Sequence, residues 1–217
     1  MTWLWWSSGK DSAWALHRLS GAERAVTGLV TTLTDPFDRV AMHGVRAPIL
    51  RAQARRVGLP LHEIRIPHPC SNEAYEAAVV PLLERAVDEG VEAMAFGDLF
   101  LEEIREYRER LLAPWPIEPL FPLWGEDTGA LAREMIEGGL EATVTCVDPA
   151  RLGPEWAGRA WDAAFVGELP DDVDPCGENG EFHTCVTAGP FFDRPIDVEP
   201  GEVVEREGFV FADLIPK

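Results

Sequence analysis

The stretch Trp3-Leu4-Trp5-Trp6-Ser7-Ser8-Gly9-Lys10-Asp11-Ser12 lies at the start of the 217-residue chain and decides its fold. Its apolar first part is typical of a short buried strand, and the apolar spacing over 12–20 predicts a helix that ends at Gly21. A polar turn containing Gly9 joins the two. A strand–turn–helix junction presents free backbone N–H groups and the positive end of the helix dipole, so this turn is suited to bind a phosphate.

Strands and helices alternate along the rest of the first half. This alternation predicts a Rossmann-like parallel sheet with helices on both faces. Ligands of such sheets bind beyond the carboxyl ends of the strands, so Ser7–Ser12, Thr32–Gly44 and Gly97-Asp98 should converge at one edge. A kink or a break is expected at Pro81, inside one helix. The expected strands are 25–31, 62–66 and 91–96, and the expected helices are 45–57, 72–89 and 101–112.

The Pro-rich stretch Pro114-Trp115-Pro116 is the best candidate for a domain boundary. It divides the chain into residues 1–115, a nucleotide-binding domain, and residues 116–217, a domain for a second substrate. The second part has mixed patterns that predict a smaller α+β domain. A helix is expected over 128–137, a strand over 142–147, a further helix over 156–166 and short strands within 187–216.

Charge is distributed unevenly between these two parts. The formal net charge is −19, of which −3 falls in residues 1–115 and −16 in residues 116–217. Such acidity argues against binding nucleic acid or an anionic membrane. There is no apolar run near the ~20 residues of a membrane span and no signal peptide. The four cysteines form no CxxC pair, so we expect reduced thiols in the cytoplasm rather than a zinc site.

The turn Ser7–Ser12 resembles the PP-loop, S-G-G-K-D-S, of the N-type ATP pyrophosphatases, with Ser8 in place of the first glycine. If that position has a positive φ, Ser8 is strained. Four later segments resemble the diphthine–ammonia ligase family within that superfamily, and the match covers nearly the whole chain in order. They are Arg39–Arg46, Phe96–Glu103 with Arg105, Tyr107 and Arg108, Phe121–Trp124, and Asp174–Thr184 with Gly189-Pro190.

This resemblance implies a HUP-type fold and an ATP-dependent ligase that forms a C–N bond. A substrate carboxylate attacks the α-phosphorus of ATP, pyrophosphate leaves, and ammonia displaces AMP from the acyl-adenylate. ATP and Mg²⁺ are the implied cofactors. The implied partners are ammonia and a carboxylate-bearing acceptor, which the family names as diphthine on a translation elongation factor. A second copy of the chain is a further candidate partner.

Candidate site residues follow from the motifs and their chemistry. Lys10 would neutralise the leaving pyrophosphate, Asp98 would hold Mg²⁺ with Asp11, and Glu178 with Glu181 would attract a cation such as ammonium or trimethylammonium. His183 would accept a proton. The expected catalytic residues are Lys10, Asp98, Glu178 and His183; the nucleotide would contact Ser7, Ser8, Gly9, Lys10, Asp11, Ser12, His43 and Gly97, and the acceptor Asn179, Glu181, Thr184 and Arg105.

Other interpretations stay open at this point. The first turn could be an ordinary Ser/Gly turn, Asp98 a helix cap, Asn179-Gly180 a tight turn, and Arg105 part of a solvated helix face. His43 could be a capping or surface residue. For the whole protein, the alternatives are a PP-loop enzyme that modifies tRNA and a nucleotide-binding module without catalysis.

Overall fold

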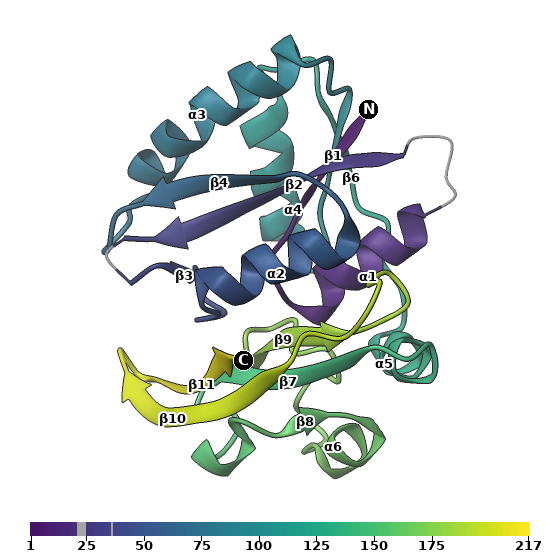
Figure 1. Cartoon of the computed structure of the whole chain (residues 1–217), viewed down its shortest axis with the longest axis vertical. Helices are drawn as coiled ribbons and strands as arrows, with labels where there is room; N and C mark the ends of the chain where they lie inside the picture. The colour runs from purple at the N-terminus through teal and green to yellow at the C-terminus, as the bar shows by residue number, and fades with distance from the viewer. Residues whose placement is uncertain (21–24, 36) are drawn as a thin grey trace.

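Two stacked sheets make up the computed structural model, which describes residues 1–217 except 21–24 and 36. The first sheet contains β1 to β6 and the second β7 to β11 (Figure 1). Strands span Thr2–Trp5 (β1), Val26–Thr34 (β2), Arg39–Val40 (β3), Leu61–Ile66 (β4), Ala93–Ala95 (β5), Glu118–Leu120 (β6), Glu141–Val147 (β7), Ala160–Trp161 (β8), Phe182–Ala188 (β9), Val198–Arg206 (β10) and Phe209–Pro216 (β11). Helices span Lys10–Leu19 (α1), Ala47–Val57 (α2), Asn72–Asp88 (α3), Glu102–Leu112 (α4), Thr128–Glu137 (α5) and Ala163–Glu168 (α6).

The first sheet is parallel except for one short strand. Its parallel strands lie in the order β4-β2-β1-β5-β6, and β3 pairs antiparallel with the end of β2. Helices α1 and α2 cover the face toward the second sheet, and α3 and α4 cover the other (Figure 1). The expected Rossmann-like sheet with helices on both faces is therefore confirmed, and β1 lies at its centre.

Alternation of side chains along β1 explains how both faces are filled. Trp3 and Trp5 belong to the apolar core under α3 and α4, whereas Leu4 and Trp6 belong to the core shared by α1, α2 and the second sheet. Successive side chains of a strand point to opposite faces. The apolar run at the N-terminus is continuous because both faces of this central strand are buried.

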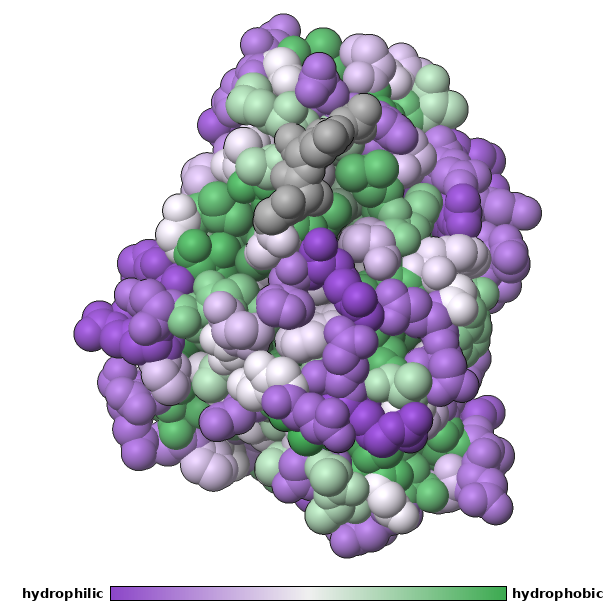
Figure 2. Space-filling model, turned by 90° about the vertical axis from the view of Figure 1, so that its right-hand side faces the viewer, coloured by the Kyte–Doolittle hydropathy of each residue, from purple (hydrophilic) through white to green (hydrophobic). Residues whose placement is uncertain are grey.

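The second sheet is antiparallel and packs against α1 and α2. Its strands lie in the order β10-β11-β7-β8, with β9 also paired to β7. Asp213 of β11 forms ion pairs with Arg39 at 2.7 Å and with Arg46 at 2.5 Å, which tie this sheet to the first. Seen from the side of α1 and α5, the surface is largely hydrophilic, with apolar residues in smaller areas between (Figure 2). Within the described residues, no helix is long and apolar enough to cross a membrane.

Several expectations need correction. α3 runs unbroken through Pro81, because Ala77, whose carbonyl loses its partner there, lies on the exposed side of the helix. Residues 156–166 are not one helix: they contain β8 and the start of α6. Strand β6 joins the first sheet, which therefore runs past residue 115, and the division at 115/116 stays a prediction. The expected helix stop at Gly21 lies outside the described residues.

Candidate active site

The phosphate loop between β1 and α1 is closed by its own hydroxyl groups. Ser7 Oγ lies 3.1 Å from Ser12 Oγ, and Ser12 Oγ donates to the Gly9 carbonyl at 3.0 Å. Gly9 N–H in turn donates to Ser7 Oγ at 3.3 Å. Gly97 at the end of β5 packs directly on this turn, since a Cβ there would lie 2.8 Å from the backbone of Asp11 and Ser12. Only glycine allows this close approach.

Ser8, which stands where the PP-loop pattern has a glycine, has a backbone conformation that favours glycine. Its φ is +71°, in the left-handed region that favours glycine. The Ser8 carbonyl accepts hydrogen bonds from Gln53 Nε2 at 3.1 Å and from Val186 N–H at 2.9 Å, so α2 and β9 fix the peptide in this orientation. The side chain is fully buried, and its hydroxyl has no hydrogen-bond partner among the described residues.

Gln53 is a central contact that the sequence did not reveal. It is fully buried in the middle of α2. Its carbonyl oxygen accepts from Trp6 Nε1 at 2.9 Å, and its amide donates to the Ser8 and Val186 carbonyls. A buried polar network of this kind holds its members in one arrangement. The network fixes the phosphate loop against β9.

Lys10 is buried between the two sheets. Its side chain is 2% exposed, and Nζ pairs with Asp11 at 2.9 Å and donates to the Cys176 carbonyl. The rings of Trp161 and Phe182 lie 5.6 and 5.4 Å from Nζ. Burial alone would lower the pKa of Lys10, but the charge of Asp11, its hydrogen bond to Nζ and the nearby Cys176 and Glu178 together outweigh burial, so the pKa is raised. The Lys10 ammonium group therefore stays charged, and it contacts the loop that leads into β9 of the second sheet.

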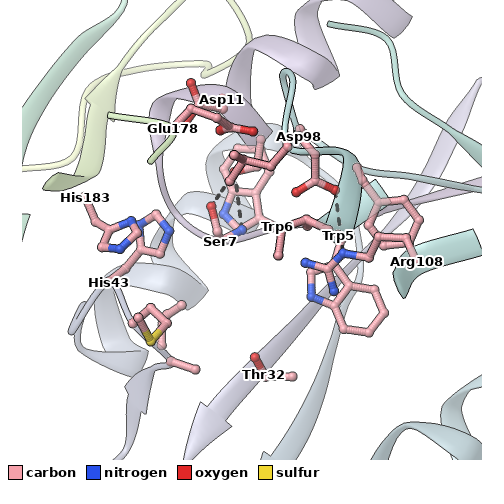
Figure 3. A pocket seen from close by; sticks show the side chains of 18 of the residues that line it. Trp5, Trp6, Ser7, Asp11, Thr32, His43, Asp98, Arg108, Glu178 and His183 are labelled. Carbon is pink, nitrogen blue, oxygen red and sulfur yellow. Dashed lines mark hydrogen bonds and ion pairs between the residues drawn. The ribbon is translucent and has the colours of Figure 1, made fainter. Parts of the chain in front are cut away.

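Two histidines face each other across the edge of the loop (Figure 3). The rings of His43 and His183 are 4.7 Å apart, and His43 Nδ1 lies 3.0 Å from the Thr184 carbonyl. A Cβ on Gly9 would come within 2.5 Å of the His43 ring, so the glycine makes room for it. Burial lowers the pKa of His43 to about 4 and that of His183 well below its usual value. Both rings are therefore neutral at pH 7.

A cavity of about 740 Å³ opens beside the loop and contains most of the expected site. Three carboxylates point toward it from separate segments: Asp11, Asp98 and Glu178 (Figure 3). Glu178 accepts a hydrogen bond from Leu99 N–H at 2.7 Å. Burial, with the charges of Asp11 and Asp98 nearby, raises the pKa of Glu178 to about 7. The pKa of Glu178 therefore lies near neutral pH, whereas that of His183 lies well below it.

The opposite end of the cavity is built by α3 and α4. Arg108 lies there beside Asp98, with its guanidinium against the rings of Trp5 and Phe96, and Tyr75 completes the wall. Arg105, expected to contact the acceptor, does not line the cavity. It lies against Phe121 and Trp124 and pairs with Glu109.

Asn179 and Glu181 also lie away from the cavity lining. Glu181 is fully buried, and its carboxylate accepts from Asp174 N–H at 3.1 Å and from Asn179 Nδ2 at 3.0 Å. These bonds brace the loop that carries Glu178. Their expected contact with the acceptor has no support in this geometry.

Two family models match the chain, the diphthamide synthase N-terminal domain over residues 2–113 and the diphthamide synthase C-terminal domain over residues 127–213. The chain belongs to the diphthamide synthase family. Curated relatives of similar length are named diphthine–ammonia ligase: the Danio rerio protein is 26% identical over 96% of this chain and 90% of its own length, and the Homo sapiens protein is 25% identical over 96% and 86%. The Schizosaccharomyces pombe protein is 24% identical over 92% of this chain and 36% of its own length.

The resemblance found from sequence motifs is therefore confirmed, and the fold brings those motifs together. In this diphthamide synthase family member, the carboxyl ends of the parallel strands β1, β2 and β5 place the segments that follow them at one edge of the sheet. The cavity is lined by Ser7, Lys10, Asp11, Ser12, His43, Gly97, Asp98, Glu178, His183 and Thr184 from the expected set. Ser8 and Gly9 belong to the same loop but do not line the cavity.

Proposed function

We propose that this protein is an ATP-dependent ligase that joins ammonia to a carboxylate. One observation carries the proposal: a phosphate-binding loop and a group of three carboxylates, contributed by both halves of the chain, open into one cavity. The volume of about 740 Å³ lies in the range of about 300–1,000 Å³ that ligand sites occupy. The relatives' name, diphthine–ammonia ligase, supports diphthine as the first acceptor to test.

In the first step the acceptor carboxylate attacks the α-phosphorus of ATP, forming an acyl-adenylate and releasing pyrophosphate. Negative charge builds on the departing phosphates as the bond breaks. The N–H groups at the start of α1 and the positive end of its dipole lie beside them. Lys10 adds a fixed positive charge behind the loop, where low polarity strengthens its effect.

In the second step ammonia attacks the acyl carbon and AMP leaves, giving a carboxamide and releasing one proton. Ammonium carries no lone pair, so it must lose a proton before it can attack. Glu178 is suited to attract ammonium and to take this proton, because its pKa of about 7 lets it change charge near neutrality. The neutral His43 and His183 leave the neighbouring wall uncharged.

Mg²⁺ fits the carboxylates of this site. Asp11 Oδ1 and Asp98 Oδ2 are buried and have no hydrogen-bond partner among the described residues. Mg²⁺ is usually held by one or two carboxylates together with substrate phosphates. Asp11 and Asp98 would therefore hold the ion, which would neutralise phosphate charge when bound.

The direct test mixes the purified protein with ATP, Mg²⁺, ¹⁵N-ammonium and elongation factor carrying diphthine. The proposal predicts AMP and pyrophosphate in equal amounts and ¹⁵N in the modified residue, all dependent on the acceptor. The Lys10→Ala variant should release far less pyrophosphate. Unchanged pyrophosphate release in that variant, or ATP cleavage that ignores both acceptor and ammonium, would refute it.

A further inference from the structure

The cavity must hold two anions in a strongly acidic protein. ATP and an acceptor carboxylate both carry negative charge, whereas Asp11, Asp98 and Glu178 already line the wall. Basic side chains among the described lining residues, apart from the neutral histidines, are Lys10, Arg108 and Arg110. A carboxylate brought into this cavity needs one of them, because a buried charge without a partner is costly.

Two of these cations are poorly placed for the task. Lys10 is already engaged by Asp11 and by the Cys176 carbonyl, and its side chain is almost fully buried. Arg110 lies at the rim, with a side chain that is 67% exposed and 3.9 Å from Glu106. Exposed ions of this kind contribute little to binding. Arg108 is the remaining candidate.

Arg108 is held firmly but is not saturated with hydrogen bonds. Its guanidinium carbon lies 5.0 Å from the Phe96 ring and 5.6 Å from the Trp5 ring, which fixes its plane. Its Nη1 lies 3.5 Å from the Tyr75 hydroxyl, the outer limit of a hydrogen bond. Arg108 Nε, although buried, has no hydrogen-bond partner among the described residues.

The ion pair between Arg108 and Asp98 does not supply the missing hydrogen bond. Nε and Asp98 Oδ2 are 3.6 Å apart, so they attract each other without a hydrogen bond (Figure 3). A pair kept only for stability would close to about 2.7–2.9 Å. The buried Asp98 Oδ2 also has no hydrogen-bond partner among the described residues.

We propose that Arg108, with the Tyr75 hydroxyl beside it, binds the carboxylate of the acceptor. The planar guanidinium offers two parallel N–H groups on its Nη1–Nη2 edge, beside Tyr75, which match a carboxylate, while Nε on its other edge faces Asp98 at 3.6 Å. This subsite and the two histidines lie at opposite sides of the phosphate loop in Figure 3. The acceptor carboxylate therefore meets ATP from the α3–α4 side, built by the first half of the chain. The identification of the bound carboxylate as that of the acceptor rests on the proposed function.

The first experiment detects anion binding without catalysis. The Arg108 Nε–H signal is recorded by NMR in ¹⁵N-labelled protein and is assigned by its loss in the Arg108→Lys variant. We expect acetate to shift this signal at concentrations where sodium chloride does not, and pyrophosphate with AMP to leave it in place. A signal that ignores acetate, or one that follows pyrophosphate, would overturn the proposal because the guanidinium would then be inert or serve the nucleotide.

The second experiment measures amidation of diphthine-bearing elongation factor by Arg108→Gln and Arg108→Lys, with Arg85→Gln as control. Arg85 is an exposed arginine of α3 that pairs with Glu89, away from the cavity. We expect the Arg108→Gln variant to raise the KM for the acceptor by about 10- to 100-fold, with the KM for ATP within about twofold. The Arg108→Lys variant keeps the charge, so its KM for the acceptor should lie between those of the wild type and Arg108→Gln. Equal losses for ATP and acceptor, or no loss for either, would contradict the proposal.

The two experiments separate failures of the subsite and of the ligase. If acetate shifts the signal and the wild-type protein does not amidate, the proposed function fails and the carboxylate subsite stands. If the wild-type protein amidates and the acetate shift is absent, the ligase stands and the subsite fails.

Discussion

Replacing Ser8 by glycine should stabilise the protein. A non-glycine residue in the left-handed region costs about 1–2 kcal/mol, and Ser8 has a φ of +71°. Glycine removes this cost, but its greater conformational freedom in the unfolded chain lowers the free energy of unfolding by about 0.4–1 kcal/mol. The substitution also removes a buried hydroxyl without a partner, which costs about 1–3 kcal/mol. After the small loss of packing, we expect a net gain of about 1–4 kcal/mol in the free energy of unfolding.

The Ser8→Ala variant separates the two contributions. Alanine removes the hydroxyl but keeps Cβ, so it retains the backbone strain. Urea unfolding followed by circular dichroism, without nucleotide, should place stability in the order glycine, alanine, serine. The reasoning is refuted if the glycine variant is no more stable than the alanine variant, because the positive φ would then carry no cost. It is also refuted if both variants are less stable than the wild type.

Three further changes test neighbouring contacts. The Gly97→Ala substitution should lower the free energy of unfolding by about 1–3 kcal/mol, because its Cβ would lie 2.8 Å from the backbone of α1. It should also weaken ATP binding, which calorimetry measures. The control is Gly167→Ala, which has open space around it and should be neutral or stabilising by up to about 1 kcal/mol. The Gln53→Leu substitution should cost about 2–4 kcal/mol in urea unfolding, since it leaves Trp6 Nε1 and the Ser8 carbonyl short of partners. Glu178 holds its proton in the folded state up to a pH of about 7, whereas the unfolded chain releases it near 4.5. The contribution of Glu178 to stability should therefore fall as the pH rises through this window, so the stability of Glu178→Gln relative to the wild type should rise by about 1–3 kcal/mol; a difference that does not change with pH would refute the raised pKa.

The pattern of the first half was sufficient to predict its sheet and the phosphate loop. The apolar residues of a strand and of a helix recur with different periods, and the turn Ser7–Ser12 lies between a segment of each kind. Ser8 has the positive φ that its place in the PP-loop pattern raised as one of two possibilities. The break considered at Pro81 does not occur, because the carbonyl that the proline frees lies on the exposed side of α3 and is hydrated at little cost; the sequence does not tell which side of a helix faces water.

Side-chain direction was the part that the sequence could not supply. Arg105 and Arg108 stand one helical turn apart, and only the packing of α4 decides which of them enters the cavity. Asn179 and Glu181 carry the same functional groups as a binding site, but their hydrogen bonds go to their own loop. Gln53 gave no signal in the sequence, because its partners come from β1, the phosphate loop and β9.

The second half was harder to predict for a related reason. Residues 156–166 have apolar spacing that suits a helix, and the second sheet uses part of them as the edge strand β8. Pairing with β7 comes from residues far away in sequence, so it overrides the local pattern. The long hairpin of β10 and β11 likewise depends on pairing rather than on composition.

The central claim is that the acceptor carboxylate is activated by transfer of AMP. It is tested most directly with acceptor whose carboxylate carries ¹⁸O, in a reaction with ATP, Mg²⁺ and ammonium followed by mass spectrometry of the nucleotides. Attack on the α-phosphorus predicts that ¹⁸O appears in the phosphoryl group of AMP and that pyrophosphate stays unlabelled. Label in inorganic phosphate together with ADP, or AMP released without label, would contradict the account.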